Sequence, residues 1–206
     1  MGVLERKKRV REDLRKRILD AAEALFVSEG YETVSMRKIA RRIEYSPTTI
    51  YHHFKDKAEL FAHLLEGYQA GLLSRMEAIN ARGDDPLTTL RNGMRAYTEF
   101  GLANPSYYKL SFMSPPEFKA ESYLVAGAAG TALFQDLRGT AELCIRQGLF
   151  RPMEADLAAQ ILWIANHGVT SLLISNPNFP WADRETLIGR VIDCAIDGLR
   201  APRGGS

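Results

Sequence analysis

The sequence predicts an all-α fold of about nine helices. Apolar residues recur with helical spacing along most of the 206 residues. No segment shows the alternation of apolar and polar residues that is typical of a half-buried strand. Cap residues, glycines and prolines separate the periodic segments. Hydrophobic residues make up 46% of the chain, enough for one sizeable core or for a small domain and a larger one.

The first two helices are predicted over residues 11–29 and 36–43. Gly30 lies just past the end of the first, where a left-handed cap is favoured. Ser35 is a good N-cap for the second. Residues 1–10 are rich in Lys and Arg, so we expect a basic arm that contacts phosphates; a solvated terminus is the alternative.

The third helix is predicted to begin at Pro47, after the N-cap Ser46, and to reach Lys55. Asp56 caps a long fourth helix over residues 57–81. Loops that contain Pro, Gly or Asn separate five further helices, and a frayed tail covers 202–206. Their expected ranges are 86–103, 104–113, 122–147, 156–175 and 183–200.

The third helix carries the pattern of a DNA-reading helix. Ile50 and Phe54 share one face and are expected to pack on the first two helices. Polar and aromatic side chains cover the opposite face, and these residue types contact phosphates and base edges in the major groove. A helical hairpin with an ordinary polar outer face is the alternative reading. The outward residues are Thr48, Tyr51, His52 and Lys55, with Thr49 and His53 on the flanks.

The segment TIYHHFKDKAEL, residues 49–60, closely resembles the DNA-binding domain of the tetracycline-repressor (TetR) family of bacterial transcription regulators. The resemblance also rests on Ile18, Ala21, Ala22, Leu25, Phe26, Gly30, Tyr31, Thr33, Val34, Ile39, Ala40 and Ser46. It implies a DNA-binding domain over residues 11–57. It also implies DNA contacts by Ser35, Arg37, Ser46, Thr48, Thr49, Tyr51, His52, His53 and Lys57.

One residue departs from the family pattern, because Glu44 stands in the turn where the family usually has glycine. That position often requires positive φ, which costs a residue with a side chain about 1 kcal/mol. Glu44 could instead adopt a different turn, or pair with Arg41 or Arg42.

Residues 58–201 are predicted to form a helical effector-binding and dimerisation domain. Trp163, Asn166 and His167 share one face of an otherwise apolar helix, where they could orient a small molecule or be satisfied core residues. The Trp-His-Gly phrase around Gly168 resembles a TetR subgroup named for those residues. The effector-pocket residues expected are Tyr107, Phe112, Met113, Phe134, Trp163, Asn166 and His167.

The last two helices are too apolar for surface helices of a monomer, which favours a two-fold dimer interface over an ordinary core. The TetR resemblance implies the same homodimer.

No catalytic constellation, cofactor or metal site is expected. Adjacent His52 and His53 point about 100° apart on a helix and cannot hold one ion together. Cys144 and Cys194 lie in apolar helical stretches without a CxxC neighbour. An enzyme using His167, Asn166 or Cys144 is the rival class, but no base and orienting group accompany a nucleophile.

The start of the chain lacks an apolar signal region, and no uninterrupted apolar run of membrane-spanning length is seen, so a cytoplasmic protein without membrane contact is expected. The predicted function is a ligand-responsive repressor. It binds a pseudo-palindromic DNA operator as a homodimer and is released by a small, largely apolar effector. An architectural or activator protein without an effector is a second rival.

Overall fold

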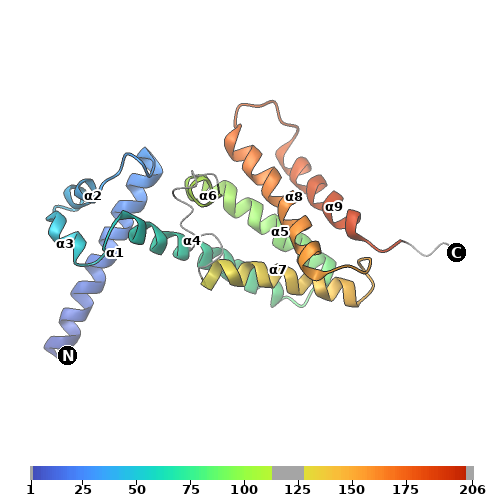
Figure 1. The fold of residues 1–206 in the computed structure, drawn as a ribbon, viewed down its shortest axis with the longest axis horizontal. Helices are drawn as coiled ribbons and strands as arrows, with labels where there is room; N and C mark the ends of the chain where they lie inside the picture. Colours follow the sequence, from blue (N-terminus) through green and yellow to red (C-terminus); the bar gives the residue numbers. More distant parts are fainter. Residues whose placement is uncertain (1, 113–127, 203–206) are drawn as a thin grey trace. The chain divides into compact units, whose positions relative to one another are not determined.

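The computed structural model describes residues 2–112 and 128–202, and these contain nine α-helices, which confirms the all-α prediction (Figure 1). The chain divides into two compact units, Met1–Gly67 and Tyr68–Ser206. The only extended pairing in the described residues is an isolated antiparallel bridge between Phe150 and Arg200.

The first unit contains α1 (Val3–Glu29), α2 (Met36–Arg42), α3 (Pro47–Tyr51) and the first turns of α4 (Lys57–Asn80). Apolar side chains from all four helices form its core, because the 3.6-residue repeat places them on facing sides. The largest fully buried side chains in this unit are Ile18, Phe26, Ile39, Ile50, Phe54 and Leu60.

The predicted start of the first helix at Arg11 is too late, since α1 begins at Val3. Residues 5–10 are exposed and carry no apolar periodicity, so the pattern could not reveal their helicity. Glu, Arg, Lys and Leu nevertheless have high helix propensity. The Glu5 carboxylate also accepts a hydrogen bond from Gly2 N at 3.2 Å, which satisfies one free amide at the helix start. The basic arm is therefore helical.

The third helix is shorter than predicted. It ends at Tyr51, with His52 as C-cap, and the amides of His53 and Phe54 both donate to the Ile50 carbonyl. The chain then turns so that Asp56 can cap α4, whose Glu59 amide donates to the Asp56 carboxylate at 2.8 Å. Phe54 remains buried at the end of this turn.

The second unit contains the rest of α4 and α5 (Pro86–Ala103), α6 (Pro105–Phe112), α7 (Ala128–Arg146), α8 (Ala155–Ser175) and α9 (Arg184–Leu199). The predicted start of α7 at Ser122 lies outside the described residues. Asp85 and Asp183 cap α5 and α9 through side-chain oxygens that accept backbone amides.

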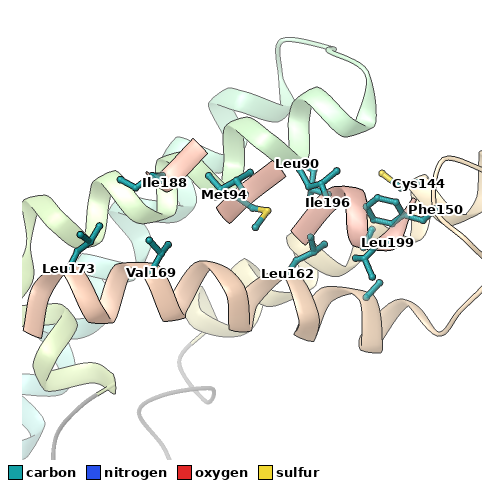
Figure 2. Close-up of a cluster of buried hydrophobic side chains, with 13 residues drawn as sticks. Leu90, Met94, Cys144, Phe150, Leu162, Val169, Leu173, Ile188, Ile196 and Leu199 are labelled. Atoms are coloured by element: carbon teal, nitrogen blue, oxygen red, sulfur yellow. The ribbon is translucent and has the colours of Figure 1, made fainter. Parts of the chain in front are cut away.

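The core of this unit lies where α5, α8 and α9 pack together, with α7 against α5 and α8. Leu162, Val169 and Leu173 lie along one side of α8 and face this core (Figure 2). Leu90 and Met94 come from α5, and Ile188 from α9. Cys144 is buried here as a free thiol, and burial raises its pKa to about 11.

By length and mean hydropathy alone, α8 is apolar enough to cross a membrane. Polar residues such as Gln160, Asn166 and His167 interrupt it, so it is not an uninterrupted apolar run. One face of α8 is instead covered by α5, α7 and α9, as expected of a core helix.

Candidate DNA-binding surface and ligand pocket

Side-chain caps fix the two short helices of the first unit. Ser35 Oγ accepts the Lys38 amide at 3.3 Å at the start of α2. Ser46 Oγ accepts the Thr49 amide at 3.2 Å at the start of α3 and lies 2.9 Å from Thr49 Oγ1. Both serines are exposed. These contacts stabilise helices too short to persist alone.

The turn between α2 and α3 is left-handed at Glu44, with φ of 62°. Glu44 is the only described residue other than glycine with positive φ. It forms no ion pair with Arg41 or Arg42 among the described residues, so the alternative of a compensating pair does not hold. The Tyr45 amide donates to the Ala40 carbonyl at 3.0 Å, which closes the turn.

The outer face of α3 is exposed and its inner face is buried, as the helical wheel predicts. Ile50 and Phe54 are at most 1% exposed, whereas Tyr51 is 53% exposed. Because the inner side chains are held in the core, the outer ones project from a fixed backbone. Thr48, Tyr51, His52 and Lys55 are exposed, and Thr49 and His53 are partly exposed.

Lys57 lies at the start of α4 and is tied to its own unit. Its ammonium donates to the carbonyls of Tyr31 at 2.8 Å and Val34 at 2.9 Å, and lies 4.0 Å from the centre of the Tyr31 ring. Partial burial lowers the pKa of Lys57, although Glu32 opposes this. Lys57 therefore joins α4 to the loop after α1, a structural role that the sequence did not reveal. Arg37 on α2, by contrast, is exposed.

Two arginines of α1 also support the α2–α3 corner. The Arg15 guanidinium lies 4.9 Å from the centre of the Phe54 ring, and Arg17 donates to the Ile43 carbonyl at 3.5 Å. Burial lowers the pKa of His53, and the charges of Arg11 and Arg15 lower it further. His53 is thus favoured in its neutral form. In the described part of the chain, no group of three His, Cys, Asp or Glu residues could hold a metal ion.

The second unit contains a pocket of about 470 Å³ between α4, α5, α6, α7 and α8. This volume lies within the range of small-molecule sites, roughly 300–1,000 Å³. Most of the lining is apolar. The apolar lining residues are Leu72, Met76, Ile79, Leu90, Met94, Phe112, Leu133, Phe134, Leu137, Leu162, Trp163 and Ile164.

The predicted pocket residues are only partly brought together. Phe112, Phe134, Trp163 and Asn166 line the pocket. The described lining does not include Tyr107, whose ring stacks on Tyr68, or His167. Met113 lies outside the described residues.

His167 contacts two tyrosines that line the pocket. Its Nδ1 lies 2.5 Å from Tyr108 Oη and 3.5 Å from Tyr97 Oη. Trp163 Nε1 donates to Tyr97 Oη at 3.4 Å. Burial lowers the pKa of His167 and raises those of Tyr97 and Tyr108. The cluster is therefore uncharged near neutral pH.

Asn166 is fully engaged within the core. Its Oδ1 accepts from Thr98 Oγ1 at 2.9 Å, and its Nδ2 donates to the Met94 carbonyl at 2.9 Å. Thr170 Oγ1 lies 3.1 Å from Thr98 Oγ1 and 2.8 Å from the Asn166 carbonyl. This chain joins α5 to α8, which fits the alternative reading of Asn166 as a satisfied core residue.

The sequence reasoning missed Tyr97 and Tyr108 as pocket residues. Tyr97 lies on α5 one turn from Met94, and both line the pocket. The available signal was a pair of tyrosines on helices next to the Trp-His-Gly helix, because buried tyrosines place a polar tip in an apolar site.

An exposed reading helix held by caps, in an all-helical chain with a separate pocketed unit, defines a helix-turn-helix DNA-binding regulator. Residues 18–64 match the model of bacterial regulatory proteins of the tetR family, and residues 90–195 match the model of the tetracyclin repressor-like C-terminal domain. The second match covers more than half of the chain. The chain therefore belongs to the TetR family of DNA-binding transcriptional regulators, which are not enzymes, and the resemblance is confirmed. Membership of the Trp-His-Gly subgroup stays a prediction.

Relatives with different roles share this similarity. The nucleoid occlusion factor SlmA of Vibrio cholerae is 30% identical over 155 residues, which is 72% of this chain and 78% of SlmA. The transcriptional activator FasR of Mycolicibacterium smegmatis is 28% identical over 128 residues, 60% of this chain and 58% of FasR.

The structure of the TetR-family transcriptional repressor FadR of Thermus thermophilus, in complex with lauroyl-CoA, superimposes with a TM-score of 0.66. It is 19% identical and covers 93% of this chain and 100% of that one. At this identity the comparison shows the fold.

Proposed function

We propose that the protein is a cytoplasmic, ligand-responsive repressor that binds a pseudo-palindromic operator as a homodimer and is released when a small apolar effector occupies the pocket. The observation that carries this proposal is that one chain holds both an exposed α3 and a pocket of about 470 Å³ in a separate unit. A protein that bound DNA without an effector would not need such a pocket.

The DNA contacts are assigned to the exposed side chains of α3 and to the start of α2. Tyr51 offers a hydroxyl and an apolar ring, and Thr48 offers a hydroxyl and a methyl group, so both can contact base edges. Arg37, exposed on α2, is assigned to the phosphate backbone. Two of the three N–H groups of the Lys57 ammonium donate to carbonyls of the first unit, so at most one remains for a phosphate.

The homodimer is assigned to an exposed stripe on α8. Leu157, Ile161 and Leu172 recur at helical spacing and are 50%, 37% and 50% exposed. Ile164, 67% exposed, lies beside this stripe and also borders the pocket. The stripe lies on α8 away from Leu162 and Leu173, which are buried in the unit's own core. A contiguous exposed apolar stripe of this kind is typical of a subunit interface. The two reading helices of a dimer would then enter major grooves about 34 Å apart.

Measurements of operator binding test the assignment of DNA contacts to α3. A duplex selected from random sequences is titrated with the wild type, Tyr51→Ala and Val27→Ala, and fluorescence anisotropy is read on the selected and on a scrambled duplex. Val27 is also exposed, at 53%, but lies on α1 outside the assigned contacts. Tyr51→Ala should weaken selected-duplex binding by about tenfold, or about 1.4 kcal/mol, and scrambled-duplex binding less. Equal losses on both duplexes would contradict base reading by Tyr51.

Sedimentation of Leu172→Glu tests the dimer. A carboxylate in an apolar interface would be buried without a partner, so this variant should sediment as a monomer while retaining its helical circular dichroism. Val27→Glu places the same charge on an exposed apolar position of the first unit and should remain dimeric. A dimeric Leu172→Glu protein, or a monomeric wild type, would refute this interface.

A release experiment tests whether a ligand in the pocket lowers operator affinity. Compounds that shift the thermal unfolding of the protein are added to the operator complex, and the operator affinity is measured again. Release requires unequal binding to the two conformations, typically by 1–3 kcal/mol, so the apparent operator affinity should fall by about 5- to 150-fold. If every compound that binds leaves operator affinity unchanged, the repressor mechanism fails. The activator FasR and the repressor FadR differ in the direction of control, which a reporter gene under the operator would decide.

A further inference from the structure

We propose that the pocket takes an uncharged, largely apolar molecule whose carbonyl or hydroxyl oxygen accepts hydrogen bonds from Tyr97 and Trp163. This inference rests on the proposed effector response and names the chemical class of the effector.

The composition of the described lining disfavours an anionic ligand. No Lys or Arg is among the described lining residues, and the one acidic residue there is Asp136. A carboxylate or phosphate ligand would enter an apolar site without a described cation and near an acidic side chain, which is unfavourable. The neutral Tyr97–Tyr108–His167 cluster supplies no compensating cation, since burial lowers the pKa of His167.

Several polar groups of the lining already have short hydrogen bonds. Asn80 Nδ2 donates to Asp136 at 2.6 Å, Ser111 donates to the Tyr107 carbonyl at 2.8 Å, and both amide atoms of Asn166 are used at 2.9 Å. Breaking these bonds would offset what a ligand gains. These groups are therefore poor anchors for a ligand oxygen.

Tyr97 and Trp163 differ because their mutual contacts are long. Trp163 Nε1 lies 3.4 Å from Tyr97 Oη, which itself lies 3.3 Å from Tyr108 Oη and 3.5 Å from His167 Nδ1. The Tyr108–His167 contact, at 2.5 Å, satisfies His167 without Tyr97. A ligand oxygen at an ordinary distance of about 2.8–3.0 Å would be a better acceptor for both donors. Both residues line the pocket, and their donor atoms lie 3.4 Å apart, close enough for one ligand oxygen to contact both.

The volume sets the size of the molecule. A volume of about 470 Å³ lies in the lower half of the range of small-molecule sites, roughly 300–1,000 Å³, so a small molecule is expected. Methyl decyl ketone, laurate and dodecane are small probes that each contain twelve carbons. They differ only in the polar group, and laurate is ionised at neutral pH.

The test measures binding of these three probes to the full-length protein by calorimetry, using the wild type, Tyr97→Phe and Tyr45→Phe. Tyr97→Phe removes one hydroxyl and keeps the ring. Tyr45→Phe makes the same change in the first unit, away from the pocket. The ketone should bind at least about tenfold more tightly than laurate. Tyr97→Phe should weaken ketone binding by about fivefold and leave dodecane unchanged, because it removes one neutral hydrogen bond. Tyr45→Phe should leave the ketone-to-dodecane affinity ratio unchanged.

Laurate binding as tight as ketone binding, no binding of any probe, or an unchanged ketone-to-dodecane ratio in Tyr97→Phe would overturn the inference. Dodecane binding shows that each variant is folded. Trp163→Phe removes the indole N–H, the second proposed donor, and should lower the ketone-to-dodecane affinity ratio in the same way. Operator affinity is measured in parallel. If laurate releases the operator and the ketone does not bind, the inference fails and the proposed function stands. If the ketone binds as expected and operator affinity is unchanged, the effector coupling fails and the inference stands.

Discussion

The substitution Gly101→Ala tests how tightly α5, α6 and α8 pack. Gly101 is buried on α5, and a Cβ built there lies 2.8 Å from Thr170 Cγ2 and 2.9 Å from Tyr108 Cδ2. Favourable separations between carbons are about 3.5–4.0 Å. The added methyl therefore requires both neighbours to move.

Neither neighbour can move cheaply. Thr170 is fully buried, and rotation of its methyl group would pull Oγ1 from Thr98 and from the Asn166 carbonyl. Tyr108 is 1% exposed and held by His167. Overpacking of this kind costs about 1–3 kcal/mol. Alanine recovers up to about 1 kcal/mol of helix propensity over glycine, so we expect a net loss of about 1–2 kcal/mol.

Thermal unfolding monitored by circular dichroism checks this expectation, and the loss corresponds to a decrease in Tm of about 2–8 °C. The matched control is Gly139→Ala on α7, where the position is exposed and a Cβ meets nothing within 4 Å. The control should gain about 0.5–1 kcal/mol. If Gly101→Ala unfolds at or above the Tm of the wild type, the packing argument is refuted.

Three further substitutions test other features. Glu44→Gly should raise the free energy of unfolding, measured in urea, by about 1 kcal/mol, because glycine adopts a left-handed φ without strain. Glu44→Ala should give no gain. Equal gains in the two variants would assign the effect to the loss of the Glu44 charge. Lys57→Met keeps the length of the aliphatic chain and should lower the free energy of unfolding by about 1–2 kcal/mol, since two ammonium hydrogen bonds are lost. Unchanged stability would show that the hydrogen bonds from Lys57 do not stabilise the contact between α4 and the loop. Burial lowers the pKa of His167 in the folded state below its unfolded value of about 6.5. The contribution of neutral His167 to the free energy of unfolding is therefore complete above about pH 6.5 and is lost as the pH falls through the folded pKa. The free energy of unfolding should therefore decrease less between pH 7 and pH 5 in His167→Asn than in the wild type. An identical decrease in both proteins would show that His167 does not cause this pH dependence.

Helix existence was readable from the sequence because it depends on apolar spacing and caps, as at Ser35 and Ser46. Helix ends were less readable. The start of α1 at Val3 depends on the propensity of exposed charged residues, and the end of α3 at Tyr51 depends on the turn that Asp56 needs to cap α4. Positive φ at Glu44 was one of the alternatives left open by the sequence, and the structure adopts it.

The pocket was readable only in part, because it is formed by side chains from five helices. Trp163 and Phe134 were named through the resemblance to the Trp-His-Gly subgroup, but Tyr97 looks like any aromatic residue on the buried side of α5. The ring of His167 is directed to Tyr108, an interaction between residues 59 positions apart that no local pattern encodes. The contacts of Lys57 with Tyr31 and Val34 are likewise set by tertiary packing.

The two hydrogen bonds from Lys57 to the carbonyls of Tyr31 and Val34 have a consequence for the cohesion of the first unit. They join the first turn of α4 to the segment that leads into α2. Fraying of that turn would therefore also break two contacts of the loop, so we expect the start of α4 and the loop before α2 to open together.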